Sequence, residues 1–302
     1  MSLNGIFTAM VTPFDQGGNI NFKVTKELTN RLIDSGVNGL FILGTNGEFV
    51  TLNKQEKFEF AKTVIEETNG RVPVIVGVGG INSQEVIETI NEIEKLKPDY
   101  LSVITPYFIK LSQDELYQHY IEISDYTELP ILLYNIPSKT GNELLPETVY
   151  RLSNINNIVG IKDSSGNINN IESYINLHAK DFIVLAGTDS LILPTLKKGG
   201  NGAIAATSNV FPELVISIYQ SYLNKNIEKA SRLQNKLEIL REESKSASVP
   251  TVFKKSLEIL GINVGPPRKP VLQLNNHQVQ NVKNMLEKYN YLELNERKMS
   301  DE

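Results

Sequence analysis

Short runs of apolar and β-branched residues alternate with longer segments of helical periodicity over the first 225 residues of the chain. Most of the short runs are apolar on both faces, which is typical of parallel strands buried beneath helices. The pattern predicts eight strands, over Gly5–Val11, Gly39–Leu43, Val72–Val76, Tyr100–Ile104, Ile131–Tyr134, Ile158–Ile161, Phe182–Leu185 and Ala203–Ala206.

The segments between these runs carry signals for the start and the end of helices. Asn21 can cap a helix, and Asn53 with Glu56 has the spacing of a capping box. Ser83 precedes a further amphipathic segment, which ends before Pro98. Strands and helices are therefore expected to alternate along the chain, in the manner of repeated strand–helix–strand units.

Eight such units in tandem predict an α/β fold, a closed (β/α)8 barrel of parallel strands ringed by helices. An open, doubly wound sheet is the competing interpretation. Gly77 and Gly79 follow a predicted strand, but Asn82 stands where a dinucleotide fingerprint has its third glycine. The sequence also contains no GxxxxGK[ST] phosphate-binding loop. The barrel is therefore favoured.

The strand pattern stops near residue 225, and three helical stretches remain, over Ile227–Ser244, Val249–Leu260 and Asn276–Tyr289. The break at Gly265-Pro266-Pro267 separates the last two. We therefore expect a catalytic barrel domain over residues 1–225 and a C-terminal helical extension over residues 226–302.

Composition excludes several classes of chemistry. The chain has no cysteine, which excludes disulfides, thiolate metal sites and a cysteine nucleophile. Its three histidines, His119, His178 and His277, do not stand at metal-ligand spacing. The net charge is -5 with both signs mixed along the chain, which disfavours binding to nucleic acid or an anionic membrane. No stretch reaches the ~18 apolar residues of a membrane span, and no signal peptide is evident, so a cytoplasmic protein is expected.

In a parallel barrel the reactive groups gather at the carboxyl ends of the strands, and Lys162 stands out there. It follows the apolar run Ile158–Ile161, so its ammonium would point into the barrel mouth beside apolar walls. Desolvation lowers the pKa of a lysine, as an amine that attacks a carbonyl to form a Schiff base requires. A salt-bridged lysine, or one that reaches into solvent, is the alternative.

Two further side chains belong to the same level of the predicted barrel. Tyr134 ends the preceding strand, and adjacent strands lie ~4.8 Å apart, so its phenol could shuttle protons near the lysine. Thr45 could supply a partner hydroxyl, while Gly44 and Gly47 would let backbone N–H groups approach a carboxylate. Alternatively, the tyrosine is an aromatic plug of the barrel interior and the loop is only a glycine-rich turn.

Five segments occur in a characteristic order: Gly44–Glu48, Tyr134–Gly141, Gly160–Asp163, Gly199–Ile204 and Pro266–Pro270. Together they resemble the dihydrodipicolinate synthase/N-acetylneuraminate lyase family of class I aldolases, from about Gly5 to Tyr289. The resemblance implies a barrel with a three-helix extension, a homo-oligomer (usually a tetramer), and no metal or organic cofactor.

The resemblance also implies roles for residues of this chain. Pyruvate would form an imine with Lys162, Tyr134 would be the general acid/base, and Thr45 would relay the proton. Backbone N–H groups of the loop at Thr45 and Asn46 would hold the pyruvate carboxylate, and Ile204 would contact pyruvate. The remaining candidates for substrate binding are Gly44, Tyr107, Lys139 for an anionic far end, Gly187, and Asp189 for a substrate hydroxyl.

Three positions depart from the usual synthase pattern. Asn46 replaces a second hydroxyl residue, and Phe108 replaces the second member of a Tyr-Tyr pair that enters a neighbouring subunit's site. Lys139 replaces an arginine that holds the distal carboxylate of aspartate semialdehyde, and it lacks the bidentate fork. The first loop is more like that of paralogues that cleave 2-keto-3-deoxy sugar acids.

The predicted function is therefore a Schiff-base lyase or synthase that joins pyruvate to an aldehyde or splits a 2-oxo acid. A sugar-acid fragment such as glyceraldehyde is slightly favoured as the aldehyde, with aspartate semialdehyde close behind. A keto-acid dehydratase and a non-catalytic keto-acid-binding paralogue are the alternatives.

Several charged residues have plainer interpretations. Glu48 is expected to hydrogen-bond loop backbone, and Asp163 to pair with a neighbouring charge or touch substrate. The basic residues expected on solvated helix faces are Lys197, Lys198, Lys254 and Lys255.

Overall fold

The computed structural model describes residues 3–177, 179 and 181–300, without the side chains of 239–240, 243–244 and 291–300. Eight parallel strands pair in chain order, and β8 pairs back to β1 to close the barrel. The closed barrel is confirmed, and the open sheet is wrong. The strands are β1 Gly5–Ala9, β2 Gly39–Ile42, β3 Val74–Val78, β4 Tyr100–Ile104, β5 Ile131–Asn135, β6 Ile158–Asp163, β7 Ile183–Ala186 and β8 Gly202–Ala205.

All strands except β4 differ from the predicted bounds by one or two residues at one or both ends, and two of these differences have a clear cause or consequence. β3 begins at Val74, not Val72, because Pro73 has no N–H to contribute to the sheet. β6 runs on to Asp163, so Lys162 lies within the strand and not beyond it. In the register of these strands, Tyr134 on β5 is paired with Lys162 on β6.

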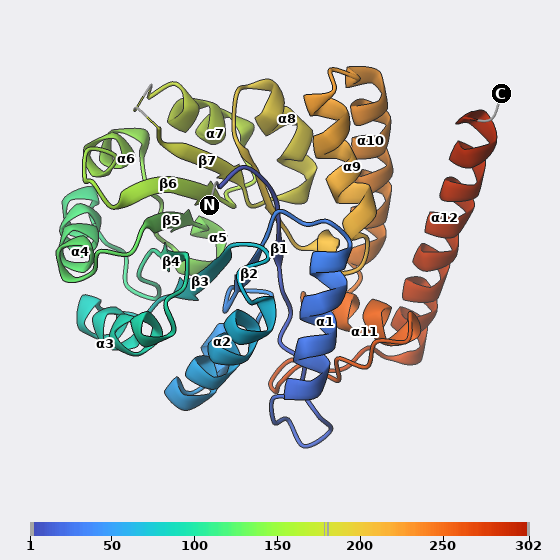
Figure 1. Ribbon diagram of the computed structural model, residues 1–302, viewed down its shortest axis with the longest axis horizontal. Helices are drawn as coiled ribbons and strands as arrows, with labels where there is room; N and C mark the ends of the chain where they lie inside the picture. The colour runs from blue at the N-terminus through green and yellow to red at the C-terminus, as the bar shows by residue number, and fades with distance from the viewer. Residues whose placement is uncertain (1–2, 178, 180, 301–302) are drawn as a thin grey trace.

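Helices surround the barrel as the sequence predicts (Figure 1). Asn21 caps α1, and Asn53 and Glu56 form the expected capping box of α2. The helices of the ring are α1 Phe22–Asp34, α2 Lys54–Thr68, α3 Ser83–Ile93, α4 Gln113–Tyr126, α5 Pro137–Thr140, α6 Pro146–Leu152, α7 Ile168–Ile175, α8 Ile192–Lys197 and α9 Pro212–Leu223. Short 3₁₀ turns are η1 Phe49–Thr51, η2 Glu94–Leu96, η3 Asp189–Leu191 and η4 Thr207–Asn209.

Three helices follow the barrel and lie together at one side of it, drawn orange to red in Figure 1. They are α10 Ile227–Ser244, α11 Thr251–Ile259 and α12 Asn276–Ser300, which extends beyond the predicted end at Tyr289. Phe211 packs on Tyr289, with ring centroids 4.3 Å apart, so α12 is held against the barrel. The division of the chain at residue 225 falls between α9 and α10 and stays a prediction. None of the described helices is both long and apolar enough to cross a membrane.

Candidate active site

Lys162 lies in the barrel mouth, buried among aromatic rings. Only 3% of the residue is exposed, and its Nζ lies 4.0 Å from the ring centre of Tyr134 and 4.2 Å from that of Phe41. Burial lowers the pKa of this amine, while Tyr134 and Asp189 act in the opposite direction. The structure thus places a lysine that is biased toward its neutral, nucleophilic form where the sequence predicts one.

Tyr134 and Thr45 lie beside this lysine as predicted. The Tyr134 hydroxyl is 3.2 Å from Thr45 Oγ1, at hydrogen-bond distance. The Tyr134 ring stands edge-on to Phe41, with centroids 6.0 Å apart, which fixes the direction of the phenol. Because either hydroxyl can donate, the pair can pass a proton in either direction.

The loop from Gly44 to Glu48 is held closely against the barrel. A Cβ at Gly44 would stand 2.1 Å from the Phe41 ring, so the close approach of the loop requires glycine there. Thr12 Oγ1 donates to the carbonyl of Gly47, with an O···O distance of 2.7 Å. Asn46 presents a buried Oδ1 for which no described group is a hydrogen-bond partner.

A cavity of about 500 Å³ opens above Lys162. Eight of the ten predicted site residues line it: Thr45, Asn46, Tyr134, Lys139, Lys162, Gly187, Asp189 and Ile204. Its remaining walls come from the residues that follow β5, β6, β7 and β8 and from α10, α11 and the turn between them: Ile136, Ser164, Thr188, Ala206, Thr207, Arg241, Lys245, Ala247, Ser248, Val249 and Phe253.

The chain is similar to known proteins along nearly its whole length. A profile of the dihydrodipicolinate synthetase family matches residues 2–289. A 4-hydroxy-tetrahydrodipicolinate synthase from Halalkalibacterium halodurans is 40% identical over 274 residues, which cover 91% of this chain and 93% of that protein. The crystal structure of a dihydrodipicolinate synthase from Bacillus anthracis is 34% identical, with a TM-score of 0.92 and coverage of 95% and 98%.

The chain belongs to the dihydrodipicolinate synthetase family. It is accordingly a Schiff-base-forming class I lyase or synthase, and this family uses pyruvate with an aldehyde substrate. A further structural relative, the prophage protein YagE from E. coli K12, was solved in complex with pyruvate. It is 30% identical to this chain, with a TM-score of 0.91 and coverage of 96% and 99%.

Two predicted site residues do not line the cavity. Gly44 is absent from the cavity walls and begins the loop whose close approach to Phe41 it permits. Tyr107 packs against Phe49, with ring centroids 6.4 Å apart, and is absent from the cavity walls. The chain turns outward directly after Tyr107, because Phe108 has a left-handed φ of 80° and is 93% exposed. Within a single chain, Tyr107 is therefore not part of the substrate cavity.

Asp189 lines the cavity, but its carboxylate is already engaged. It accepts hydrogen bonds from the backbone N–H of Ala206 at 3.1 Å and from Thr207 N and Oγ1 at 2.8 and 2.6 Å. These bonds fix the turn that follows β8. The geometry favours a structural role over the predicted contact with a substrate hydroxyl.

Asp163 forms no ion pair with a described residue, so that prediction is wrong, and it is absent from the cavity walls. It is fully buried and accepts hydrogen bonds from Asn135 Nδ2 at 2.8 Å and from Ser165 N and Oγ at 3.1 and 2.6 Å. Burial raises the pKa of this carboxyl, against the lowering effect of those donors. The network ties the ends of β5 and β6 together behind Tyr134 and Lys162.

Lys254 was expected on a solvated helix face, and this prediction is wrong. Its side chain is 1% exposed, and its Nζ lies 2.6 Å from Glu48 Oε1. Glu48 does bind backbone as expected, but the N–H belongs to Arg268 in the C-terminal segment. The helical pattern around Lys254 marks a face of α11, and only the fold reveals what covers that face.

Sequence reasoning missed the cavity residues that come from the C-terminal helices. Arg241 on α10, Lys245 directly after this helix and Phe253 on α11 close one side of the cavity. They lie outside the strand ends, where the barrel pattern predicts reactive groups. Their only signal was the resemblance to a family with a C-terminal extension.

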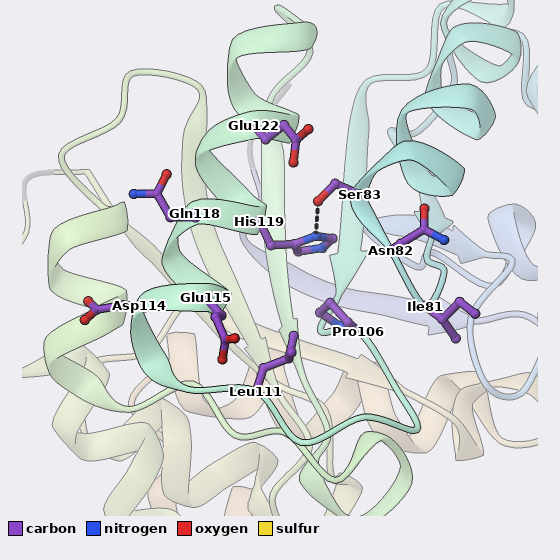
Figure 2. A pocket seen from close by; sticks show the side chains of 10 residues that line it. All are labelled: Ile81, Asn82, Ser83, Pro106, Leu111, Asp114, Glu115, Gln118, His119 and Glu122. Carbon is purple, nitrogen blue, oxygen red and sulfur yellow. Dashed lines mark hydrogen bonds between the residues drawn. The ribbon is translucent and has the colours of Figure 1, made fainter.

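A second cavity, of about 450 Å³, lies between α3 and α4 on the outside of the barrel (Figure 2). His119 lies in its wall, and His119 Nδ1 is 3.0 Å from Ser83 Oγ. The buried Nε2 of this histidine has no hydrogen-bond partner among the described residues. Across the part of the chain that the structure describes, no three His, Cys, Asp or Glu side chains are grouped so that they could hold a metal ion.

Proposed function

We propose that this enzyme condenses pyruvate with aspartate semialdehyde, through an imine on Lys162. One observation carries the imine step: the buried amine of Lys162 lies against Tyr134, whose hydroxyl is 3.2 Å from Thr45 Oγ1. A neutral amine, a phenol and a relay hydroxyl are the groups that imine formation needs.

Each step of the chemistry then has a residue to carry it. Lys162 Nζ forms a bond to the pyruvate carbonyl carbon, and the C–O bond breaks with loss of water after proton transfer through Tyr134. The imine nitrogen then withdraws electrons, so that the methyl group gives a proton back to Tyr134 and becomes an enamine carbon. This carbon bonds to the aldehyde carbon as the C=O double bond opens and its oxygen takes a proton from Tyr134, and either water or an internal amine of the product then displaces Lys162.

The cations of the cavity support an aldehyde with an anionic group. Lys139, Arg241 and Lys245 all line the cavity with Lys162. Arg241 and Lys245 pair with Glu238 and Glu242 on their own helix, whereas Lys139 forms no ion pair with a described residue. Lys139 is therefore the best candidate partner for the distal carboxylate of aspartate semialdehyde. The names of the relatives, 4-hydroxy-tetrahydrodipicolinate synthases, are consistent with this aldehyde.

A second candidate function is cleavage of a 2-keto-3-deoxy sugar acid to pyruvate and an aldehyde. The side chains of Asn46 and Phe108 favour it, because neither offers the hydroxyl that the synthase pattern has at that position. Asn46 also brings a buried amide oxygen without a described partner to the cavity, where a sugar hydroxyl could donate to it.

Borohydride reduction with pyruvate, followed by peptide mass mapping, tests the shared imine step. We expect a pyruvyl adduct on Lys162 and none in Lys162→Met. An adduct on another lysine, or no adduct in the wild-type enzyme, overturns the proposal.

The two aldehydes are separated by a coupled assay on the wild-type enzyme and on Lys139→Met. With aspartate semialdehyde we expect KM to rise about 10-fold or more in the variant, since a hydrogen bond to a charged group is worth about 1.5–3 kcal/mol. With glyceraldehyde, which has no carboxylate, KM should stay unchanged. Faster wild-type turnover of glyceraldehyde than of aspartate semialdehyde would favour the sugar-acid reaction instead.

We also propose that the enzyme is a homo-oligomer. Val50, Ile81, Phe108 and Ile109 are 51–93% exposed, and they belong to the three successive loops after β2, β3 and β4. Exposed apolar side chains gathered on neighbouring loops are typical of a protein interface. A second copy of the chain is the partner that the family resemblance implies.

A further inference from the structure

Glu48 and Lys254 form a buried ion pair outside the substrate cavity. Glu48 ends the loop after β2, Lys254 lies on α11, and neither lines the cavity. Their side chains are 4% and 1% exposed, and the Nζ–Oε1 distance is 2.6 Å. Burying two charges costs several kcal/mol of solvation each, which only close pairing and further polar contacts offset.

Both ends of the pair have such contacts, and the hydrogen bonds among them go to the segment after α11. Lys254 Nζ donates to the carbonyl of Pro266 at 3.2 Å and lies 4.1 Å from the ring centre of Phe14. Glu48 Oε2 accepts from the backbone N–H of Arg268 at 2.8 Å. The pair therefore joins the C-terminal segment to the loop that carries Thr45.

A short chain of contacts leads from the pair to the reacting groups. The backbone N–H of Glu48 donates to the carbonyl of Thr45 at 3.2 Å, which closes the loop into a tight turn. Glu48 has a left-handed φ of 55°, an unfavourable conformation that surrounding contacts must maintain. Thr45 Oγ1 in turn lies at hydrogen-bond distance from the Tyr134 hydroxyl. A shift of Glu48 would thus move the Thr45 hydroxyl relative to Tyr134.

We propose that Glu48 and Lys254 are positioning residues: Lys254 on α11 holds the Glu48 carboxylate, and Glu48 sets the position of the Thr45 hydroxyl beside Tyr134. The inference rests on the proposed function, because it assumes that Thr45 and Tyr134 relay the proton to and from the imine on Lys162. It gives the C-terminal extension a role in the chemistry besides closing the cavity.

A second clamp holds the same segments and makes the inference testable. The Arg268 guanidinium pairs with Glu56 and donates to the carbonyls of Gly18 and Thr51 at 2.7–2.9 Å. These bonds do not involve Lys254. Loss of the Lys254 charge should therefore displace the loop while the C-terminal segment stays attached.

The first test compares Lys254→Met with Lys255→Met, its neighbour on the same helix. Lys255 pairs with Glu258 on the surface of α11, at 2.7 Å, and such a pair contributes little to stability. We expect Lys254→Met to lower kcat by roughly 10-fold or more, because small misplacements of reacting groups cost up to ~100-fold in rate. The KM for pyruvate should change little, and Lys255→Met should leave kcat and KM unchanged.

A double variant separates positioning from folding. Lys254→Met alone leaves a buried carboxylate unpaired, whereas Glu48→Gln/Lys254→Met removes both charges, a change that is often neutral for stability. We expect the double variant to unfold at nearly the wild-type temperature and still to have the low kcat. Wild-type kcat in a folded double variant would overturn the inference.

A double-mutant cycle with Thr45→Val tests whether the effect passes through Thr45. If Lys254 acts through that hydroxyl, Lys254→Met should lower kcat no further in the Thr45→Val background. Fully independent, multiplicative effects would overturn the inference. Borohydride trapping of the wild-type enzyme separates failure of the proposed function from failure of this inference. No adduct on Lys162 refutes the proposed function. An adduct on Lys162, together with independent effects of Lys254→Met and Thr45→Val on kcat, refutes only the role of Lys254.

Discussion

At the scale of single residues, the environment of Lys162 decides its chemistry. Burial among Phe41 and Tyr134 lowers the pKa of its amine, so folding favours the neutral form that a nucleophile requires. The same burial disfavours the charged form, and the folded state therefore gains reactivity at the expense of stability near neutral pH.

Because burial disfavours the charged form of Lys162, we can predict how Lys162→Met changes the free energy of unfolding. The folded pKa lies below the unfolded value near 10.5, so the unfolded chain binds more protons between these two values. Wild-type stability should therefore rise with pH within that window, and the variant should lack this rise and be more stable at neutral pH. Urea unfolding at pH 7 and pH 9.5 measures it, with Lys139→Met as the exposed control. A variant less stable at pH 7 would show that the contacts with Tyr134 and Asp189 outweigh desolvation.

Single residues were predictable where the strand pattern alone determines their position. Lys162, Tyr134 and Thr45 follow apolar runs, and the register then brings them together. Lys254 was not predictable, because helical periodicity indicates a face but not its distant partner Glu48. Asp163 was misjudged for the same reason, since its partners Asn135 and Ser165 are neutral donors that no charge pattern reveals.

At the scale of elements, close backbone contacts fix how the C-terminal segment meets the barrel. Phe14 N donates to the carbonyl of Val264 at 2.9 Å, just after β1. Gly265 follows with a φ of 70°, and a Cβ there would stand 1.9 Å from the Phe14 carbonyl oxygen. Only glycine permits this contact.

We therefore predict that Gly265→Ala destabilises the enzyme more than Gly261→Ala. Gly261 also has a positive φ, of 91°, but nothing lies within 4 Å of its added Cβ. Both substitutions carry the cost of a left-handed conformation, about 1–2 kcal/mol, and only Gly265→Ala adds a backbone clash. Thermal unfolding of both variants measures the difference. Equal losses would show that the segment can move away from Phe14.

The contact between α3 and α4 predicts a pH dependence of stability (Figure 2). Burial lowers the pKa of His119 to about 4, against a weaker opposite effect of Glu122. With a reference value near 6.5, the unfolded chain binds the extra proton between pH 4 and 6.5, so stability falls as pH falls through this window. The free energy of unfolding should be higher above pH 6.5 than below pH 4 by roughly 3 kcal/mol, because each unit of difference between the folded and unfolded pKa of His119 corresponds to about 1.36 kcal/mol.

Chemical unfolding between pH 4 and pH 7 measures this dependence in the wild type, His119→Gln and His277→Gln. His119→Gln should flatten the profile, because the amide does not titrate. His277 is exposed on α12, and its replacement should leave the profile unchanged. An unaltered slope in His119→Gln would assign the acid sensitivity to the carboxylates.

The order and type of the elements were largely predictable, because eight apolar runs separated by capped helices admit few arrangements. The boundaries of the elements were less predictable. β3 begins only after Pro73, and α12 continues past Tyr289. The turn that Asp189 holds after β8 could not be foreseen, since it depends on hydrogen bonds between two strand ends that are distant in sequence.

At the scale of the whole molecule, the cavity belongs to both the barrel and the C-terminal helices. The barrel supplies Lys162, Tyr134 and Thr45, and the helices supply Arg241 and Lys245. The barrel alone was predictable in detail, because its repeat fixes its closure. The packing of the helices over the mouth follows from side-chain contacts that periodicity does not encode.

Assembly is the remaining property of the whole molecule, and the apolar loops predict it. Phe108 is 93% exposed, and Val50, Ile81 and Ile109 are 66%, 51% and 59% exposed. Burying apolar surface contributes about 25 cal/mol per Å², so these side chains together favour self-association. We expect the enzyme to be a dimer or tetramer, and Phe108→Asp to weaken that state, because an unpaired carboxylate would be buried at the interface.

Sedimentation analysis across a range of concentrations measures the oligomeric state of wild type, Phe108→Asp and Leu272→Asp. Leu272 is 78% exposed but belongs to the C-terminal segment and not to these loops, so its variant should assemble normally. If Phe108→Asp assembles as the wild type does, the interface lies elsewhere. If it dissociates and loses turnover while borohydride still traps pyruvate on Lys162, the neighbouring subunit contributes to the steps after imine formation. A monomeric variant with full turnover would instead show that one chain holds the complete site.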